Sequence, residues 1–168
     1  MIQVNTKTTG GQQVEEGLRK IMERFKETSD RVLVGVPRGA GEYEDGTPIA
    51  VIAAVNNFGS ADGRIPERNF MHSAINENQA IYKRLAEVEL PKVGRGVLQM
   101  ERLLHTLGEL AVGHIQEKMV EGPFVANAPS TIDQKGSDRP LIDTGNLRQS
   151  ISYEIPPPSE QIDEGIGR

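Results

Sequence analysis

The strongest constraint on the fold is a run of apolar residues at helical spacing near the middle of the chain. From Val97 to Met119 these residues recur every three or four positions, which is the period of one face of an amphipathic helix. Gly94 and Gly96 precede the run, and Gly122 follows it as a terminator. The pattern predicts one long helix whose apolar face carries Val97, Met100, Leu103, Leu104, Leu107, Ala111, Ile115 and Met119.

The same spacing predicts two further helices. One begins near Phe70, ends at Pro91 and has an apolar face made of Phe70, Ala74, Ile81, Leu85 and Val88. This helix and the central one can form an antiparallel pair. The other lies near the amino terminus, where Val14, Leu18, Ile21, Met22 and Phe25 share one face and charged residues occupy the rest.

Shorter apolar runs predict strands and a buried helix. Residues 31–37 are rich in β-branched valine and end at Pro37. Residues 151–155 alternate like a half-buried strand. Thr47-Pro48 predicts the N-cap and first position of a short buried helix, which Gly59 closes with a left-handed conformation. We therefore expect an α+β fold, with a small mixed sheet, several helices including the long pair, and extended loops.

The composition predicts one domain that is stabilised by contacts with other subunits. The 168 residues fit a single domain over 1–155, followed by an acidic tail over 156–168 that begins with three prolines. Only 36% of the residues are hydrophobic and 4% aromatic, so the core is thin and oligomerisation is expected. We expect neither a signal peptide nor a membrane-spanning segment. The absence of cysteine suits a reducing cytoplasm.

Charge and motif content argue against most chemical functions. The net charge of -5 disfavours general nucleic-acid binding, although it permits DNA to slide past. Arg64 and Arg68 are interleaved with acidic residues, so a solvated or subunit-pairing face is favoured over a phosphate site. His72, His105 and His114 have no metal-ligand spacing. We expect no metal and no cofactor.

One tripeptide resembles a catalytic motif. Asp143-Thr144-Gly145, preceded by Leu141-Ile142, is similar to the active-site loop of aspartic proteases, in which two such loops share a proton. In a homodimeric protease of that type most of the sheet follows the loop, whereas only 23 residues follow here, which leaves no room for the fold. We favour a capped turn that Gly145 permits, and we keep an aspartic-protease-like hydrolase as the alternative.

Two segments resemble the virion-morphogenesis and tail-completion families of long-tailed bacteriophages, which include minor tail proteins and head-tail joining proteins. The first runs from Ile52 to Phe70 and contains A-x-x-N-x-F-G, then I-P-x-R-x-F. The second runs from Ala128 to Ile151 and is similar to the families' S-x-T-x-x-x-K-G and P-L-x-D-T-G-x-L-x-x-S stretches. A helical region separates the two, as in those families.

The resemblance implies a non-enzymatic ring in the virion, at the head-proximal end of the tail, assembled in the cytoplasm of the host bacterium. The expected partners are other copies of the chain, preferably six and possibly twelve, the head connector, stopper or portal, the tail terminator or tail tube, and DNA passing through the lumen without specific binding. A cytoplasmic adaptor unrelated to phages is a further alternative. The residues expected at subunit or partner interfaces are Phe58, Arg64, Ile65, Pro66, Arg68, Phe70, Phe124, Lys135, Arg139, Asp143 and Thr144.

The irregular segment 122–140 is expected to contact neighbouring subunits. It is longer than ordinary connections and rich in Gly, Pro, Asn and Ser. Its few apolar residues cannot offset the entropy of ordering it within one subunit, so we hypothesise that it becomes ordered when the ring assembles.

Overall fold

A computed structural model of the chain describes residues 11–26, 29–127, 141 and 145–158. Its helices and antiparallel strands confirm the expected α+β class. In chain order the elements are α1 (Gly11–Lys26), β1 (Leu33–Gly35), α2 (Ile49–Phe58), α3 (Phe70–Glu77), α4 (Gln79–Gly94), α5 (Met100–Glu121), α7 (Asn146–Gln149) and β2 (Ser152–Glu154).

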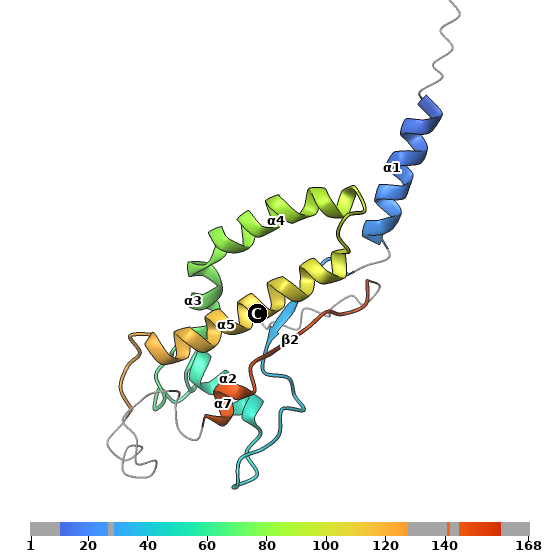
Figure 1. Ribbon diagram of the computed structural model, residues 1–168. Helices are drawn as coiled ribbons and strands as arrows, with labels where there is room; N and C mark the ends of the chain where they lie inside the picture. Colours follow the sequence, from blue (N-terminus) through green and yellow to red (C-terminus); the bar gives the residue numbers. More distant parts are fainter. Residues whose placement is uncertain (1–10, 27–28, 128–140, 142–144, 159–168) are drawn as a thin grey trace, which may run out of the picture.

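Helix α5 is the centre of the fold (Figure 1). It packs against α3 and α4 on one side and against both strands on another. The apolar face read from the sequence explains this position, because Leu104, Ala111, Ile115 and Met119 are all buried. Helices α4 and α5 lie side by side with opposite chain directions, so the predicted antiparallel pair is confirmed (Figure 1).

The two strands form a small antiparallel sheet against α5. Val34 pairs with Tyr153, and Leu33 pairs with Glu154. Within the residues described, the sheet has these two strands, so the expected mixed sheet is antiparallel there. The approach of β2 to α5 depends on Gly108, because a Cβ at that position would overlap the ring of Tyr153.

The main hydrophobic core lies where α2, α3, α7 and the second half of α5 meet. Its fully buried members include Phe70, Ile115 and Met119. Leu147 of α7 and Ile151 before β2 complete it from the other end of the chain. Residues far apart in sequence therefore share one core.

Two predicted helix boundaries are wrong. The expected single helix from Phe70 to Pro91 is two helices, because Asn78 leaves the helical conformation and its side-chain amide donates a hydrogen bond to the Ala74 carbonyl over 2.9 Å. Pro91 does not end α4, which continues to Gly94. A proline in the last turn removes one hydrogen bond without preventing the residues after it from staying helical.

The start of α2 also differs from the expectation. Pro48, not Thr47, is the N-cap, and no side chain caps the helix. Thr47 belongs to the preceding turn, where its backbone N–H donates to Asp45 over 2.9 Å. That hydrogen bond, given to a carboxylate, keeps the pKa of Asp45 below its usual value. Gly59 has the predicted positive φ of 78°, but its ψ of 168° makes it extended rather than left-handed helical.

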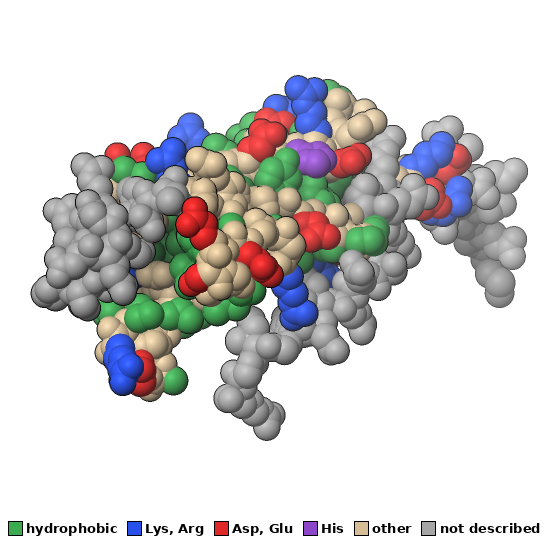
Figure 2. All heavy atoms as spheres, turned by 90° about the horizontal axis from the view of Figure 1, so that it is seen from below, with side chains coloured by type: hydrophobic (Ala, Val, Ile, Leu, Met, Phe, Trp, Pro, Cys, Tyr) green, Lys and Arg blue, Asp and Glu red, His purple; other side chains and the backbone are tan. Residues whose placement is uncertain are grey.

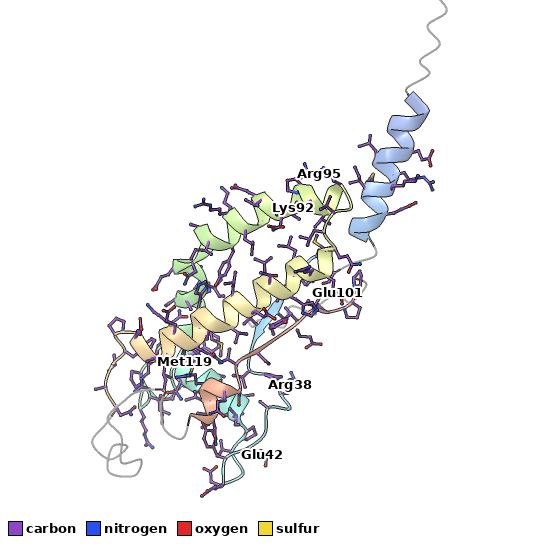
Figure 3. All side chains as sticks on the ribbon, viewed as in Figure 1. Arg38, Glu42, Lys92, Arg95, Glu101 and Met119 are labelled. Carbon is purple, nitrogen blue, oxygen red and sulfur yellow. The ribbon has the colours of Figure 1, made fainter. Side chains whose placement is uncertain are left out.

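Charged side chains gather at the end of the α4–α5 pair. Lys92 and Arg95 lie at the carboxyl end of α4 and Glu101 in the first turn of α5 (Figure 3). Cations at a helix C-terminus and anions at a helix N-terminus both interact favourably with the helix dipole. This arrangement favours the tight turn over residues 95–99.

Helix α1 confirms the predicted amino-terminal helix but stands away from the body of the molecule (Figure 1). Its described apolar side chains, Leu18, Ile21 and Met22, are exposed. Its charged residues form ion pairs along the helix, Arg19 with Glu23 and Lys20 with Glu16. The apolar face of α1 is therefore not part of the core just described.

Candidate partner interface

Arg68 forms the most extensive polar cluster that the structure describes. Its guanidinium donates to the Asn56 side-chain carbonyl over 2.9 Å, to the Val125 backbone carbonyl over 3.1 Å and to the Asn127 side-chain carbonyl over 3.1 Å. The residue is 4% exposed, and burial lowers the pKa of Arg68 from its ordinary value. Arg68 thus ties the end of α2 to the segment that follows α5.

Asn57, the neighbour of Asn56, holds the start of α3. It is buried, and its side-chain carbonyl accepts a hydrogen bond from the Met71 backbone N–H over 3.1 Å. The backbone N–H of Arg68 also donates to the Asn56 carbonyl over 2.9 Å. The asparagines at the end of α2 and the arginine before α3 therefore have structural partners within the chain.

The loop between α2 and α3 is held by its own hydrogen bonds. The Ser60 hydroxyl donates to Asp62 over 2.6 Å and accepts from the Ile65 backbone N–H over 2.8 Å. The hydrogen bond from Ser60 and a second one from the Arg64 backbone N–H, over 3.1 Å, lower the pKa of the Asp62 carboxyl. A Cβ at Gly59 would crowd the Ile65 carbonyl and the Glu67 N–H, so glycine permits the close approach. The loop can present its outer side chains in a fixed arrangement.

The expected interface residues divide into exposed and buried groups. Phe58 is 74% exposed, and Arg64 and Ile65 are also exposed, whereas Pro66 is half-buried. By contrast, Phe70 is 0% exposed and, like Arg68, belongs to the interior of the subunit. Half-buried Phe124 packs against the main core. Lys135, Arg139, Asp143 and Thr144 lie outside the described residues, as does most of the segment 122–140.

Exposed apolar side chains extend beyond Phe58. Hydrophobic surface is visible over the face that contains α2 and α7, among scattered Asp and Glu side chains (Figure 2). Val51 of α2 and Val125 after α5 are both exposed. Helix α2 was expected to be buried, but only one of its faces is, because Ile49, Ala53 and Asn57 point inward. The outward face is available for contact with another protein.

The two segments that resemble the phage families, here called the family-like segments, meet in the core. Leu141 and Leu147 are buried together with Ala53 and Phe70. Leu141 has a φ of 63°, an uncommon conformation for a residue with a side chain, and Gly145 has a φ of 84° before α7. The predicted short helical turn after Asp143-Thr144-Gly145 is confirmed as α7, which packs against α2.

The two histidines of α5 face different elements, as their spacing predicts. His114 Nδ1 lies 2.7 Å from the Tyr82 hydroxyl of α4, and His105 Nδ1 lies 2.9 Å from the Tyr153 hydroxyl of β2. Burial raises the pKa of Tyr82. Each pair joins α5 to a neighbouring element. In the described ranges, no three His, Asp or Glu side chains are grouped in a way that could hold a metal ion.

Comparison of the chain with known protein families, curated proteins and solved structures gives no match. No helix among the residues described is both long enough and apolar enough to cross a membrane. The two motif segments and the geometry around them therefore carry the functional argument.

Sequence reasoning missed two features of the structure. One is the pairing of Arg68 with Asn56 and Asn127, for which the only signal was the position of Asn56 in the A-x-x-N-x-F-G pattern. The other is the apolar surface of α4, where Ile81 and Val88 are exposed. The periodicity assigned these residues to an apolar face, but periodicity alone does not say which partner covers it.

Proposed function

We propose that the chain is a structural virion protein of a long-tailed bacteriophage, which forms a ring at the head-proximal end of the tail and completes the tail or joins it to the head. The observation that carries the proposal is the convergence of the two family-like segments. Ala53 and Phe70 of the first share one core with Leu141, Leu147 and Ile151 of the second. Two segments that are far apart in the sequence thus meet in one core.

The motif residues have positions that suit a scaffold rather than a reaction centre. Arg68 binds carbonyl oxygens of its own chain, Asn56 accepts one of these bonds, and Phe70 fills the core. Exposed Phe58, Arg64 and Ile65 remain for contacts with other subunits. Rings form when one surface of a subunit fits a different surface of the next.

The partners in this proposal are other copies of the chain, six in preference to twelve because tails are six-fold, and the proteins above and below the ring. These are the connector, stopper or portal on the head side and the terminator or tube on the tail side. The net charge of -5 suits a lumen through which DNA slides, because few phosphates would be held tightly. The protein would reside in the virion.

The deciding experiment removes the gene from the phage and restores it in trans. We expect lysates of the deletion phage to contain filled heads and separate tails, and complementation to restore joined particles and plaques. Electron microscopy of the purified protein should reveal closed rings. Normal head-tail joining without the protein would contradict the proposal.

A hydrolase is not part of this proposal, and a separate variant checks that point. We expect Asp143→Asn to have the same peptidase background as the native chain, because a protease of the aspartic type needs two carboxylate loops and a large sheet. Of the residues described after Asp143, only α7 and β2 are regular, and β2 pairs with β1. Peptide cleavage by the native chain that disappears in Asp143→Asn would instead favour the hydrolase.

A further inference from the structure

Helix α1 carries an apolar stripe that the described part of its own chain leaves exposed. Leu18 and Met22 are 56% and 57% exposed, and Ile21 lies on the same face because the three residues follow the i, i+3, i+4 spacing. The helix points away from the other elements (Figure 1) and makes no extensive packing contact with a described one. Such a stripe is expected to be covered in the working assembly.

A second exposed apolar surface lies on α4. Ile81, Leu85 and Val88 follow one another at i, i+4 and i+7, and the first and last are exposed. Leu85 also lines a groove of about 360 Å³ between α4 and α5, whose apolar wall includes Leu98 and the 74% exposed Val97. Helices α1 and α4 both contain 16 residues, so one can cover the other along its full length.

Most of the charged side chains described beside these two surfaces are paired along their own helix. On α1, Arg19 pairs with Glu23 over 3.2 Å and Lys20 with Glu16 over 2.9 Å. On α4, Lys92 pairs with Glu89 over 2.7 Å and Lys83 with Glu87 over 3.9 Å. Arg84, beside the α4 stripe, and Arg102, in the groove lining, have no ion pair among the described residues, but both are exposed and can keep their guanidinium groups in water at the edge of the contact. The described Lys and Arg side chains of α1 are both paired, which disfavours an anionic lipid surface or a nucleic acid as the partner of this helix, because those attract helices rich in free Lys and Arg.

We propose that α1 of one copy docks on α4 of a second copy, with its stripe of Leu18, Ile21 and Met22 against Ile81, Leu85, Val88 and the mouth of the α4–α5 groove. The inference rests on the proposed ring and deepens it by naming one subunit contact. Because donor and acceptor are different surfaces of the same chain, the contact is heterologous. Repeated around an axis, such contacts close a ring.

The geometry favours a second copy over the chain's own α1. Residues 27–29 connect the end of α1 at Lys26 to Asp30, and these four chain steps span at most about 14 Å when fully extended. Beyond them, Asp30 and Val32 line a different groove, together with Leu104 and Leu107 of α5. The docking groove uses Leu103 and Thr106, which point about 100° away around the same helix. The short link would have to cross the helix pair to bring α1 there.

The experiment uses engineered cysteines, because the native chain has none. Full-length Leu18→Cys protein is mixed with full-length Val88→Cys protein under assembly conditions and oxidised. We expect a mixed disulfide-linked dimer as the main product, and a ladder of covalent oligomers from the Leu18→Cys/Val88→Cys double variant. The matched control is Lys20→Cys with Val88→Cys, which should remain monomeric on a denaturing gel because Lys20 lies on the opposite face of α1.

The outcomes separate this contact from the ring itself. Closed rings without the Leu18–Val88 disulfide, or with equal linkage in the Lys20 control, would overturn the docking and leave the proposed ring standing. Covalent chains that never close would support the docking and contradict the ring. A double variant that gives only an internally linked monomer would place α1 on its own chain and overturn the inference. Absence of both rings and disulfides would overturn both.

Discussion

Arg68 joins three parts of the chain that are distant in sequence. Its hydrogen-bond acceptors belong to Asn56 in α2 and to Val125 and Asn127 after α5. All three acceptors are oxygen atoms. Only the planar guanidinium of an arginine has N–H donors that point toward all three at once. The side chain therefore stabilises the fold and also fixes where the segment after α5 begins.

Replacing Arg68 with alanine should destabilise the subunit by about 2–4 kcal/mol, because partly buried carbonyl oxygens lose their donors. Urea unfolding followed by circular dichroism measures the effect. The control is Arg64→Ala, since Arg64 is exposed and pairs with nearby Asp62 over 3.2 Å, a kind of ion pair that contributes little. Equal midpoints for the two variants would contradict the structural role given to Arg68.

Phe58 and Phe70 provide a second comparison at the scale of single residues. Phe70→Ala should lower the free energy of unfolding by about 3–5 kcal/mol, because it opens a cavity in the core. Phe58→Ala should change it by less than about 0.5 kcal/mol, as expected for an exposed site. Thermal melts of the dissociated subunit test both. A large loss in Phe58→Ala would mean that this ring packs within its own subunit.

At the scale of elements, the position of β2 on α5 depends on one glycine. Gly108→Ala should destabilise the subunit by about 1–3 kcal/mol, because the added methyl group would displace the ring of Tyr153. Gly113→Ala in the same helix meets open space and should stabilise by about 0.5–1 kcal/mol, the usual gain when alanine replaces a helical glycine. Denaturant midpoints should move in opposite directions, and a parallel shift would contradict the packing.

The sequence predicted most elements correctly where a single period governed a long segment. Helices α1 and α5 follow the 3.6-residue spacing, and β2 follows strict alternation. The break at Asn78 was missed because it depends on a side chain that bonds to the Ala74 carbonyl, which leaves no trace in the apolar pattern. The interior position of Arg68 was missed because its acceptors lie up to 59 residues away.

At the scale of the whole molecule, the subunit combines a well-packed body with a helix that contributes little to it. The main core draws on α2, α3, α5 and α7, whereas the described apolar side chains of α1 are exposed. Folding of the body and association through α1 should therefore be separable. In the proposed ring, this separation would let the subunit fold before it assembles, with a modest apolar stripe exposed until the next copy docks.

The double variant Leu18→Glu/Met22→Glu tests this separation. Surface substitutions away from packed features usually change stability by less than about 0.5 kcal/mol, so the unfolding midpoint of the body should stay near that of the native chain. The mass in solution should fall from that of the ring to that of the monomer, since two carboxylates cannot be buried against an apolar groove without a charge partner. Light scattering and a urea titration on the same sample measure both quantities.

The control, Glu16→Gln/Lys20→Gln, removes an ion pair from the opposite face and should keep the native mass. A several-degree loss in thermal stability of Leu18→Glu/Met22→Glu would mean that α1 packs on its own subunit.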